Sequence, residues 1–342
     1  MTPRERETAE DRETEQRETY EKCEEYVDTK GAEVPVAVGE FAGAEGAAEV
    51  EEFTVCDPGG GPYALAAGPD GALWFTLVHS GRIGRLVPGE EPRSHRVDPD
   101  SGPTVLCAGP DGALWFTQYK AHRIGRITVA GEVTGFAPPT AECGPFGIAA
   151  GPDGALWFTE TAADRVGRLG TEGTFTEYPL PVAGAFPSAI AAAGDAMWFT
   201  LNQADALGRI GMDGAVTVHE LPTAGAAPVG IAVGPDGSVW WTEIGAGQIG
   251  RLAPDGRITE YPLPDRSARP HAITTDAAGA AWFTEWGGNR LGRITAEGAL
   301  THYALPTPAA EPHGIAIGPD GAVWAALEIG ALARLGRAGT GA

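Results

Sequence analysis

The sequence of 342 residues is short of basic side chains. Lys and Arg together number 24, against 46 Asp and Glu, which gives a formal net charge of -22 at pH 7. This excess of negative charge argues against binding to nucleic acid or to an anionic membrane surface, because like charges repel one another. We therefore expect neither partner, and a metal cation or a small neutral or cationic ligand is easier to accommodate.

Cysteines and long apolar segments are also scarce. The sequence has 4 cysteines, and none lies in a CxxC pair or at zinc-ligand spacing from histidines. This argues against a disulfide framework and a zinc site, and it predicts reduced thiols. No apolar run approaches the roughly 18 to 20 residues of a membrane span, and the N-terminus lacks the apolar stretch of a secretion signal. The sequence therefore predicts a cytoplasmic protein.

Residues 1–48 differ in composition from the rest of the chain. They are rich in Glu, Arg, Thr and Asp, then in Ala, Gly, Glu and Val. Such a segment has too few large apolar side chains to offset the entropy lost on ordering. We expect a charged N-terminal tail over residues 1–48, either disordered or forming a solvated helix, and a folded domain over residues 49–342.

One sequence unit recurs from residue 52 onward. Its core reads GPDGALWFT, followed by a short polar segment, then GRIGRI, then a DG or EG turn and a stretch like ITEYPLP. The first tryptophan of each core recurs every 41 or 42 residues, at Trp74, Trp115, Trp157, Trp198, Trp240, Trp282 and Trp324. This period is typical of β-propellers. A helical solenoid is excluded, because every candidate helix would contain Gly or Pro in its interior.

Each unit contains four short segments of alternating apolar residues separated by Gly, Pro and Asp, which predicts a four-stranded antiparallel blade. The seventh unit ends after its third segment, at ARLGRAG, and the stretch EEFTV before the first unit matches the missing fourth one. We expect residues 51–55 to close the ring by pairing with the last blade, which protects edges that would otherwise be exposed. The predicted fold is all-β, a seven-bladed β-propeller closed by an N-terminal strand.

The repeats serve as one another's controls, because residues needed for turns and packing recur in every copy. The residue after the proline that opens each inner strand varies instead: it is Tyr63, Thr104, Phe146, Ser188, Val229, His271 and His313 in turn. In a propeller these positions form a ring at one end of the central axis. The two histidines are neighbours on consecutive blades, and Tyr63 follows His313 across the closure.

Glutamates are expected at the same end of the ring, because the second strands run back toward it. Glu160, Glu243 and Glu285 recur in the frame WFTE and are interpreted as scaffold, whereas Glu328 stands one place later and Glu311 lies two residues before His313. Two carboxylates suit Mg²⁺, and Mn²⁺ is possible as well. A nearby neutral imidazole, with an ordinary pKa of about 6.5, can accept a proton. The set fits proton abstraction next to a carbonyl that a metal polarises.

Histidines near a propeller axis are often only structural, but two at equivalent positions with acids alongside favour a functional site. The remaining histidines fall in turns or outer strands and are assigned no role: His79, His95, His122, His219 and His302.

Over residues 52–342 the sequence resembles the virginiamycin B lyases, also called streptogramin lyases. The motifs that carry the resemblance are PHAI at His271, EPHGI from Glu311, a glutamate four residues after Trp324, and PYAL in the first blade. The resemblance implies that Glu311 and Glu328 bind Mg²⁺ and that His313 accepts the proton. It also implies that His271 and Tyr63 bind substrate.

The resemblance further implies a lyase that opens streptogramin B-type cyclic depsipeptides by elimination at their ester bond, which would inactivate these antibiotics. His313 would take the Cα proton of the threonyl residue, and Mg²⁺ would stabilise the charge that develops on the carbonyl oxygen. The expected partner is a small cyclic depsipeptide, and a monomer is expected. Two alternatives remain: a metal-dependent propeller hydrolase of the lactonase or esterase type, and a non-catalytic propeller that binds peptides or proteins through its rim.

Overall fold

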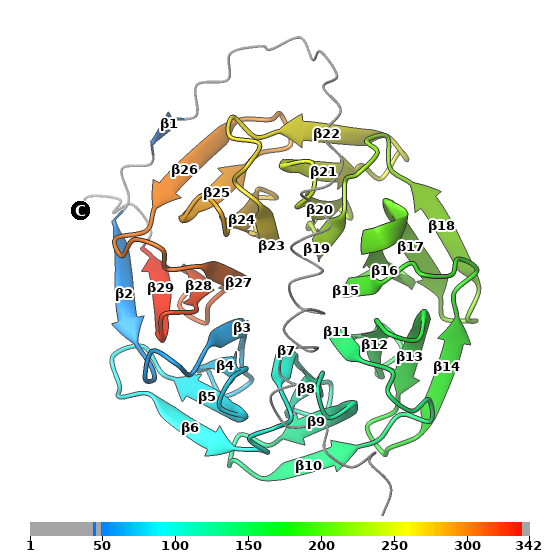
Figure 1. Ribbon diagram of the computed structural model, residues 1–342, viewed down its shortest axis with the longest axis vertical. Helices are drawn as coiled ribbons and strands as arrows, with labels where there is room; N and C mark the ends of the chain where they lie inside the picture. The colour runs from blue at the N-terminus through cyan, green and yellow to red at the C-terminus, as the bar shows by residue number, and fades with distance from the viewer. Residues whose placement is uncertain (1–43, 46–48, 337–342) are drawn as a thin grey trace, which may run out of the picture. The chain divides into compact units, whose positions relative to one another are not determined.

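The computed structural model describes residues 44–45 and 49–336. Seven antiparallel sheets surround a common axis (Figure 1), so the predicted seven-bladed propeller is confirmed. Six sheets have four strands, and the sheet of the sixth blade gains a fifth through the short strand β1, Ala44–Glu45, which pairs in parallel with residues 301–302. Within the described residues the secondary structure is otherwise β, apart from one 3₁₀ turn, η1, at Asn202–Ala204.

The blades repeat one order of strands from the axis outward (Figure 1). The inner strands are β3 (Pro62–Ala67), β7 (Pro103–Ala108), β11 (Pro145–Ala150), β15 (Pro187–Ala193), β19 (Pro228–Val233), β23 (Pro270–Thr275) and β27 (Pro312–Ile317). The second strands are β4 (Leu73–Leu77), β8 (Leu114–Gln118), β12 (Leu156–Glu160), β16 (Ala196–Leu201), β20 (Val239–Glu243), β24 (Ala281–Glu285) and β28 (Val323–Leu327).

The outer half of each blade follows the same order. The third strands are β5 (Arg82–Leu86), β9 (Arg123–Ile127), β13 (Arg165–Leu169), β17 (Ala206–Gly211), β21 (Gln248–Leu252), β25 (Arg290–Ile294) and β29 (Ala331–Leu335). The fourth strands are β6 (Arg93–Arg96), β10 (Val133–Phe136), β14 (Phe175–Pro179), β18 (Val216–Glu220), β22 (Ile258–Pro262), β26 (Leu300–Ala304) and β2 (Val50–Thr54).

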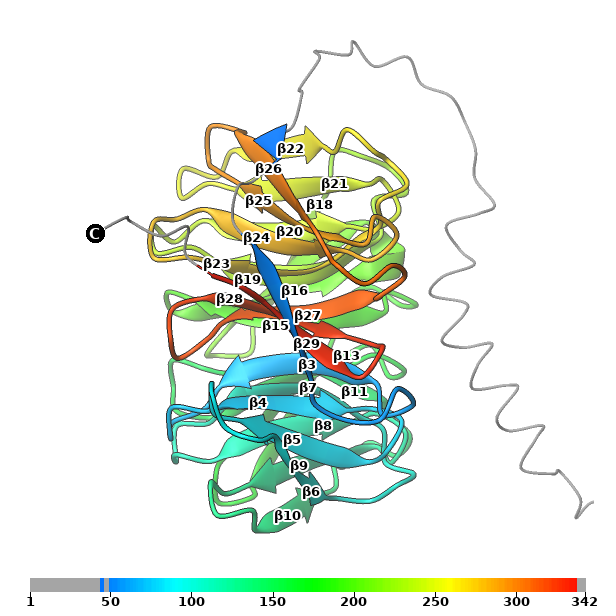
Figure 2. The ribbon, with the colours of Figure 1, turned by 90° about the vertical axis from the view of Figure 1, so that its left-hand side faces the viewer.

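The ring closes through the N-terminal strand, as the sequence predicted. β2 pairs antiparallel with β29 from Val50 opposite Leu335 to Thr54 opposite Ala331, and the two strands lie side by side in Figures 1 and 2. Glu52 of β2 also accepts hydrogen bonds from the backbone N–H and the hydroxyl of Thr307, in the loop that leads into the seventh blade. Glu177 makes the same pair of bonds with Thr140 in the third blade. The closing strand therefore reproduces the contacts of an ordinary fourth strand.

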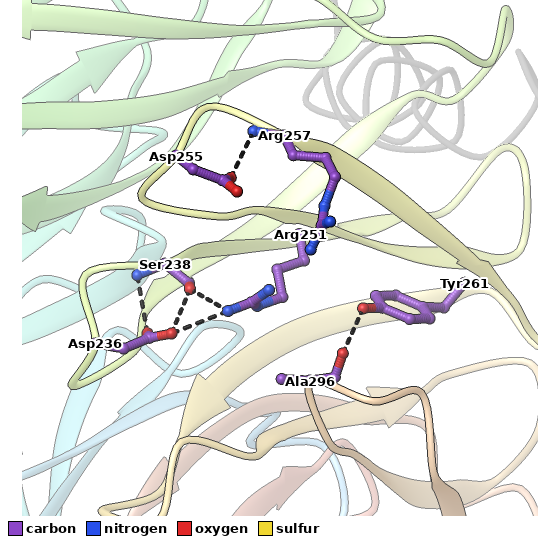
Figure 3. Close-up of polar contacts among 7 residues, drawn as sticks. All are labelled: Asp236, Ser238, Arg251, Asp255, Arg257, Tyr261 and Ala296. Carbon is purple, nitrogen blue, oxygen red and sulfur yellow. Dashed lines mark hydrogen bonds and ion pairs between the residues drawn. The ribbon is translucent and has the colours of Figure 1, made fainter.

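The recurring Asp, Trp and Arg form a structural cluster beside the turn that joins the inner and second strands. In the first blade, Asp70 accepts hydrogen bonds from the indole of Trp74 and from Arg85, whose guanidinium lies over the Trp74 ring. The fifth blade builds a related cluster (Figure 3), in which Asp236 accepts from Ser238 and Arg251. These repeated arginines are therefore structural.

Contacts between neighbouring blades depend on the threonine of each WFT core. The Thr76 hydroxyl accepts a hydrogen bond from Ala64 N–H of its own inner strand and donates one to the carbonyl of Thr104 in the next blade. The equivalent donors in blades two to six are Thr117, Thr159, Thr200, Thr242 and Thr284. The seventh blade has Ala326 at this position, so the seam between the last and first blades lacks the hydroxyl.

Other sequence expectations are resolved in part. Of the predicted tail over residues 1–48, only Ala44–Glu45 lies within the described residues, and the extent of the tail stays a prediction. Cys56, Cys107 and Cys143 are free thiols, and Cys23 lies outside the described part. No helix in the described ranges is both long and apolar enough to cross a membrane.

Candidate functional site

The candidate residues gather at one end of the ring, where the inner strands begin and the second strands end. We call this end the histidine rim, after His271 and His313. Each inner strand shifts register just past its opening proline, for example between Pro312 and Ile315 in β27. Such β-bulges re-aim side chains. The residue after the proline therefore falls in the bulge on every blade, which explains why this position is free to vary.

The structure brings together the three rim residues that the sequence singled out on consecutive blades. The ring centroids of Tyr63 and His313 are 4.8 Å apart, those of His271 and His313 are 5.2 Å apart, and those of Tyr63 and His271 are 6.0 Å apart. Tyr63 is 7% exposed and His313 is 8% exposed. These three rings form one contiguous, largely buried aromatic wall across the closure of the propeller.

His271 is held in its neutral form. Burial, together with the adjacent His313, lowers the pKa of His271 to about 3. Its Nδ1 atom is buried and has no hydrogen-bond partner within the described part of the chain. A neutral imidazole with an unused nitrogen can donate to or accept from a ligand, depending on its tautomer, but it does not supply positive charge.

Glu328 connects this wall to a third histidine, His79. Its Oε2 atom lies 2.6 Å from Nε2 of His313, and its Oε1 atom lies 2.8 Å from Nε2 of His79. The hydrogen bonds from His313 and then from His79 hold the pKa of the Glu328 carboxyl well below its usual range. Glu328 is therefore ionised, and its carboxylate lies between two imidazoles.

The ionised carboxylate defines the tautomer of both histidines. A carboxylate can only accept hydrogen bonds, so each imidazole must donate from Nε2–H. In neutral His313 the lone pair is then on Nδ1, which is buried and has no protein partner among the described residues. In enzymes that use a histidine as general base, a carboxylate placed in this way orients the imidazole and stabilises the imidazolium that forms.

Glu311 lies directly before β27 with an exposed side chain. Its backbone is adjacent to that of Glu328, since the Glu328 N–H donates to the carbonyls of Ala310 and Glu311 at 3.1 and 3.3 Å. Glu311 has a positive φ of 50°, in the region that favours glycine. The equivalent positions of the first three blades are all glycines: Gly61, Gly102 and Gly144. A glutamate here carries a conformational cost, as do Phe186, Ala227 and Arg269 at the same position of blades four to six.

The donor set fits a metal that needs few protein ligands. No group of three or more His, Cys, Asp or Glu within the described residues is arranged to hold a metal ion. Mg²⁺ is commonly bound by one or two carboxylates, with water and substrate oxygens completing its shell. Glu311 and Glu328 supply two carboxylates from adjacent backbone. Each carboxylate oxygen has two lone-pair positions, so Glu328 could bind a metal while it still accepts from both histidines.

Sequence reasoning assigned no role to His79, which the structure places in contact with Glu328. The signal was present, because His79 stands five residues after the core tryptophan, where the other repeats have Lys120, Ala162, Gln203, Gly245, Gly287 and Ile329. The other histidines assigned no role lie away from this cluster. His95 and His219, for instance, pack on the core tryptophans Trp74 and Trp198.

The strand direction predicts that the scaffold glutamates lie at the histidine rim, but their side chains do not reach it. Glu160, Glu243 and Glu285 are fully buried within their own blades. Glu243 accepts hydrogen bonds from Trp241 and Gln248, and Glu285 is paired with Arg290. Their side chains point toward the third and fourth strands. The side chain of Glu328 is not buried within its blade in this way, because Glu328 lies one residue beyond the end of β28.

Comparison with known proteins places these features in a family. The model of the virginiamycin B lyase family matches residues 48–335, which is most of the chain. The chain belongs to the virginiamycin B lyase family. A virginiamycin B lyase of Saccharopolyspora erythraea is 62% identical over 94 residues, which cover 28% of this chain and 31% of that relative. The matched segment thus spans less than a third of that protein's length.

Solved structures of family members match the whole propeller. A streptogramin B lyase structure is 41% identical with a TM-score of 0.80, and the match covers 84% of this chain and 97% of the other. A catalytically inactive histidine-to-alanine variant of virginiamycin B lyase from Staphylococcus aureus, solved with quinupristin, is 36% identical with a TM-score of 0.81. That match covers 84% of this chain and 98% of the other.

Proposed function

We propose that this protein is a lyase that linearises streptogramin B-type cyclic depsipeptides by elimination at their ester bond, and so inactivates these antibiotics. The observation that carries the proposal is the pairing of His313 with ionised Glu328 beside His271 and Tyr63. Family membership supports it, as does the quinupristin-bound relative, whose activity is lost in a histidine-to-alanine variant.

His313 serves as the general base. His313 takes the proton from Cα of the substrate's threonyl residue on one ring nitrogen, and its other ring nitrogen can donate to the Glu328 carboxylate. The imidazolium that forms is stabilised by the Glu328 carboxylate. As the Cα–H bond breaks, its electron pair forms the Cα–Cβ double bond, and the Cβ–O bond of the ester breaks. The products are a linear peptide with a dehydrated threonine and a free carboxylate, and no water is consumed.

His271 and Tyr63 bind the substrate rather than exchange protons with it. Because the pKa of His271 is lowered to about 3, its imidazole stays neutral near pH 7 and serves as a polar contact. The Tyr63 ring packs against His313 with an interplanar angle of 33°, which limits the orientations available to the base. Together the two side chains shape the surface that the depsipeptide would meet.

Glu311 and Glu328 would hold Mg²⁺, or Mn²⁺, next to this base. When bound, a divalent cation polarises the carbonyl oxygen on which negative charge develops during proton removal. Losing one electrophilic donor of this kind typically costs about 10²- to 10³-fold in rate. The cytoplasmic location and the monomeric state expected from the sequence stay predictions.

The test is mass spectrometry of a streptogramin B depsipeptide incubated with the purified protein and Mg²⁺. We expect a product of unchanged mass with the ultraviolet absorbance of a dehydroamino acid. EDTA and the variant His313→Ala should each abolish it. A product that gains one water would instead establish the hydrolase alternative, and an untouched substrate with correctly folded protein would refute the lyase proposal.

A further inference from the structure

A half-exposed histidine outside the set implied by the family resemblance contacts the ionised carboxylate of the site. His79 lies in the turn between β4 and β5 of the first blade, 249 residues before Glu328 in the sequence. The distance from its Nε2 to Glu328 Oε1 is 2.8 Å, and its side chain is 49% exposed. The contact joins the first blade to the last one, at the seam where Ala326 replaces the bridging threonine.

The surroundings of His79 leave room for its imidazole. A Cβ atom at Gly61 would lie 2.3 Å from Cδ2 of the His79 ring and 2.9 Å from its Nε2. Gly61 therefore provides the space that the ring occupies. The turn itself is fixed by a hydrogen bond from Val78 N–H to the Gly61 carbonyl, at 2.9 Å. The imidazole thus has a defined place next to Glu328.

The second blade supplies a matched comparison. Lys120 stands at the position equivalent to His79, and Gly102 stands at the position of Gly61. A Cβ atom at Gly102 would lie 2.9 Å from Cγ of Lys120, so the side chain packs over glycine in both blades. The packing is therefore a property of the repeat. The imidazole and its contact with a carboxylate belong to the first blade.

We propose that His79 is a positioning residue that orients the Glu328 carboxylate. Its Nε2–H donates a hydrogen bond to Oε1 and thereby directs Oε2 toward Nε2 of His313. In this orientation the remaining lone pairs of the carboxylate are available to a divalent cation. This inference rests on the proposed function, in which Glu328 is both the partner of the base and a metal ligand. Residues that hold a metal ligand in place typically contribute about 10- to 100-fold in metal affinity.

The role predicts an effect on metal binding with little effect on folding. A hydrogen bond between exposed side chains contributes little to stability, so His79→Ala should melt within a few degrees of the wild type. The same variant should weaken Mn²⁺ binding, measured by electron paramagnetic resonance on the full-length protein, by about 10- to 100-fold. His79→Gln, whose amide N–H can replace Nε2–H, should restore the affinity. Lys120→Ala should leave it unchanged.

Turnover of the depsipeptide, measured in parallel, separates this inference from the proposed function. If His79→Ala turns over the depsipeptide at the wild-type rate and binds Mn²⁺ with unaltered affinity, the role of His79 is overturned and the lyase proposal stands. If the wild-type protein shows no turnover, while Mn²⁺ binding is weakened in His79→Ala and restored in His79→Gln, the lyase is refuted and the positioning role is supported. Failure of the wild type to bind Mn²⁺, or an equal loss in Lys120→Ala, would overturn the inference.

Discussion

Oε2 of Glu328 lies 2.6 Å from Nε2 of His313, although 15 residues and a reversal of strand direction separate them. Because the carboxylate accepts a hydrogen bond from the imidazole that we propose as the base, its negative charge matters for turnover as much as its shape. Glu328→Gln keeps the size of the side chain but removes the charge and halves its acceptor capacity. We expect turnover to fall by about 10²-fold or more, as for other electrostatic contributions in active sites.

The change should act on chemistry and metal binding and leave the fold intact. Glu51→Gln is the control, because Glu51 is an exposed carboxylate of β2 paired with Arg334 and the variant makes the same change of charge. Its turnover should equal that of the wild type. Full activity in Glu328→Gln would remove Glu328 from the mechanism.

A second prediction concerns the backbone conformation of Glu311. Its φ of 50° is the conformation that glycine adopts in the first three blades, so Glu311→Gly should relieve strain. We expect a gain in stability of up to about 1 kcal/mol, seen as a higher melting temperature, together with loss of Mn²⁺ affinity and turnover. Such an opposition of stability and activity is common at functional sites.

Ala227→Gly is the matched control for Glu311. Ala227 occupies the equivalent position of the fifth blade, with a φ of 45°. Its replacement should stabilise the protein by a similar amount and leave metal binding and turnover as they were. If Glu311→Gly retained its Mn²⁺ affinity, Glu311 would not be a metal ligand.

The sequence alone could predict the fold because one unit recurs seven times, and each copy shows which residues turns and packing require. The pairing of Phe75 with Gly84 is an example: a Cβ at Gly84 would lie 2.0 Å from the Phe75 ring. In the last blade both partners become alanine, with Ala325 opposite Ala333. Ala333 can carry a Cβ because Ala325 replaces the ring that fills this space in the first blade, a link that only the strand register reveals.

The candidate site could be predicted only as far as repeat positions allowed. Tyr63, His271 and His313 share one position on three consecutive blades, so the ring closure alone brings them together. The contact of His79 with Glu328 depends on side-chain direction in two turns, which strand periodicity does not determine. Likewise the burial of Glu160 follows from its place inside β12, whereas Glu328 lies one residue beyond β28.

A third prediction uses the threonine that the last blade lacks. Thr284 donates to the carbonyl of His313 and accepts from Ala272 N–H, at 2.7 and 3.0 Å. Thr284→Ala should cost about 1–2 kcal/mol, because it removes buried hydrogen bonds. Ala326→Thr should supply the same bridge to the first blade and raise the melting temperature. An unchanged or lower melting temperature in Ala326→Thr would show that the seam cannot accept the hydroxyl.

A fourth prediction concerns pH and the buried carboxyl of Glu160. Burial, and then the nearby carboxylate of Glu177, raise the pKa of Glu160 from its ordinary value of 4.5 to about 8. Between these two values the unfolded chain binds fewer protons than the folded protein, so this group makes stability fall as pH rises from 4.5 to about 8. Glu160→Gln removes the titration. It also copies Gln118, which occupies the equivalent position of the second blade at 5% exposure.

Urea unfolding at two pH values checks this expectation. At pH 9 the variant Glu160→Gln should exceed the wild type in free energy of unfolding, by on the order of 1–2 kcal/mol, because the wild type must ionise a buried group or keep its proton at a cost. At pH 4.5 most of the gain should vanish, since the folded protein then holds the proton and the unfolded chain holds it half of the time. Glu132→Gln, at an exposed turn, should show no difference between the two pH values. An equal gain for Glu160→Gln at both pH values would mean that packing, and not ionisation, accounts for it.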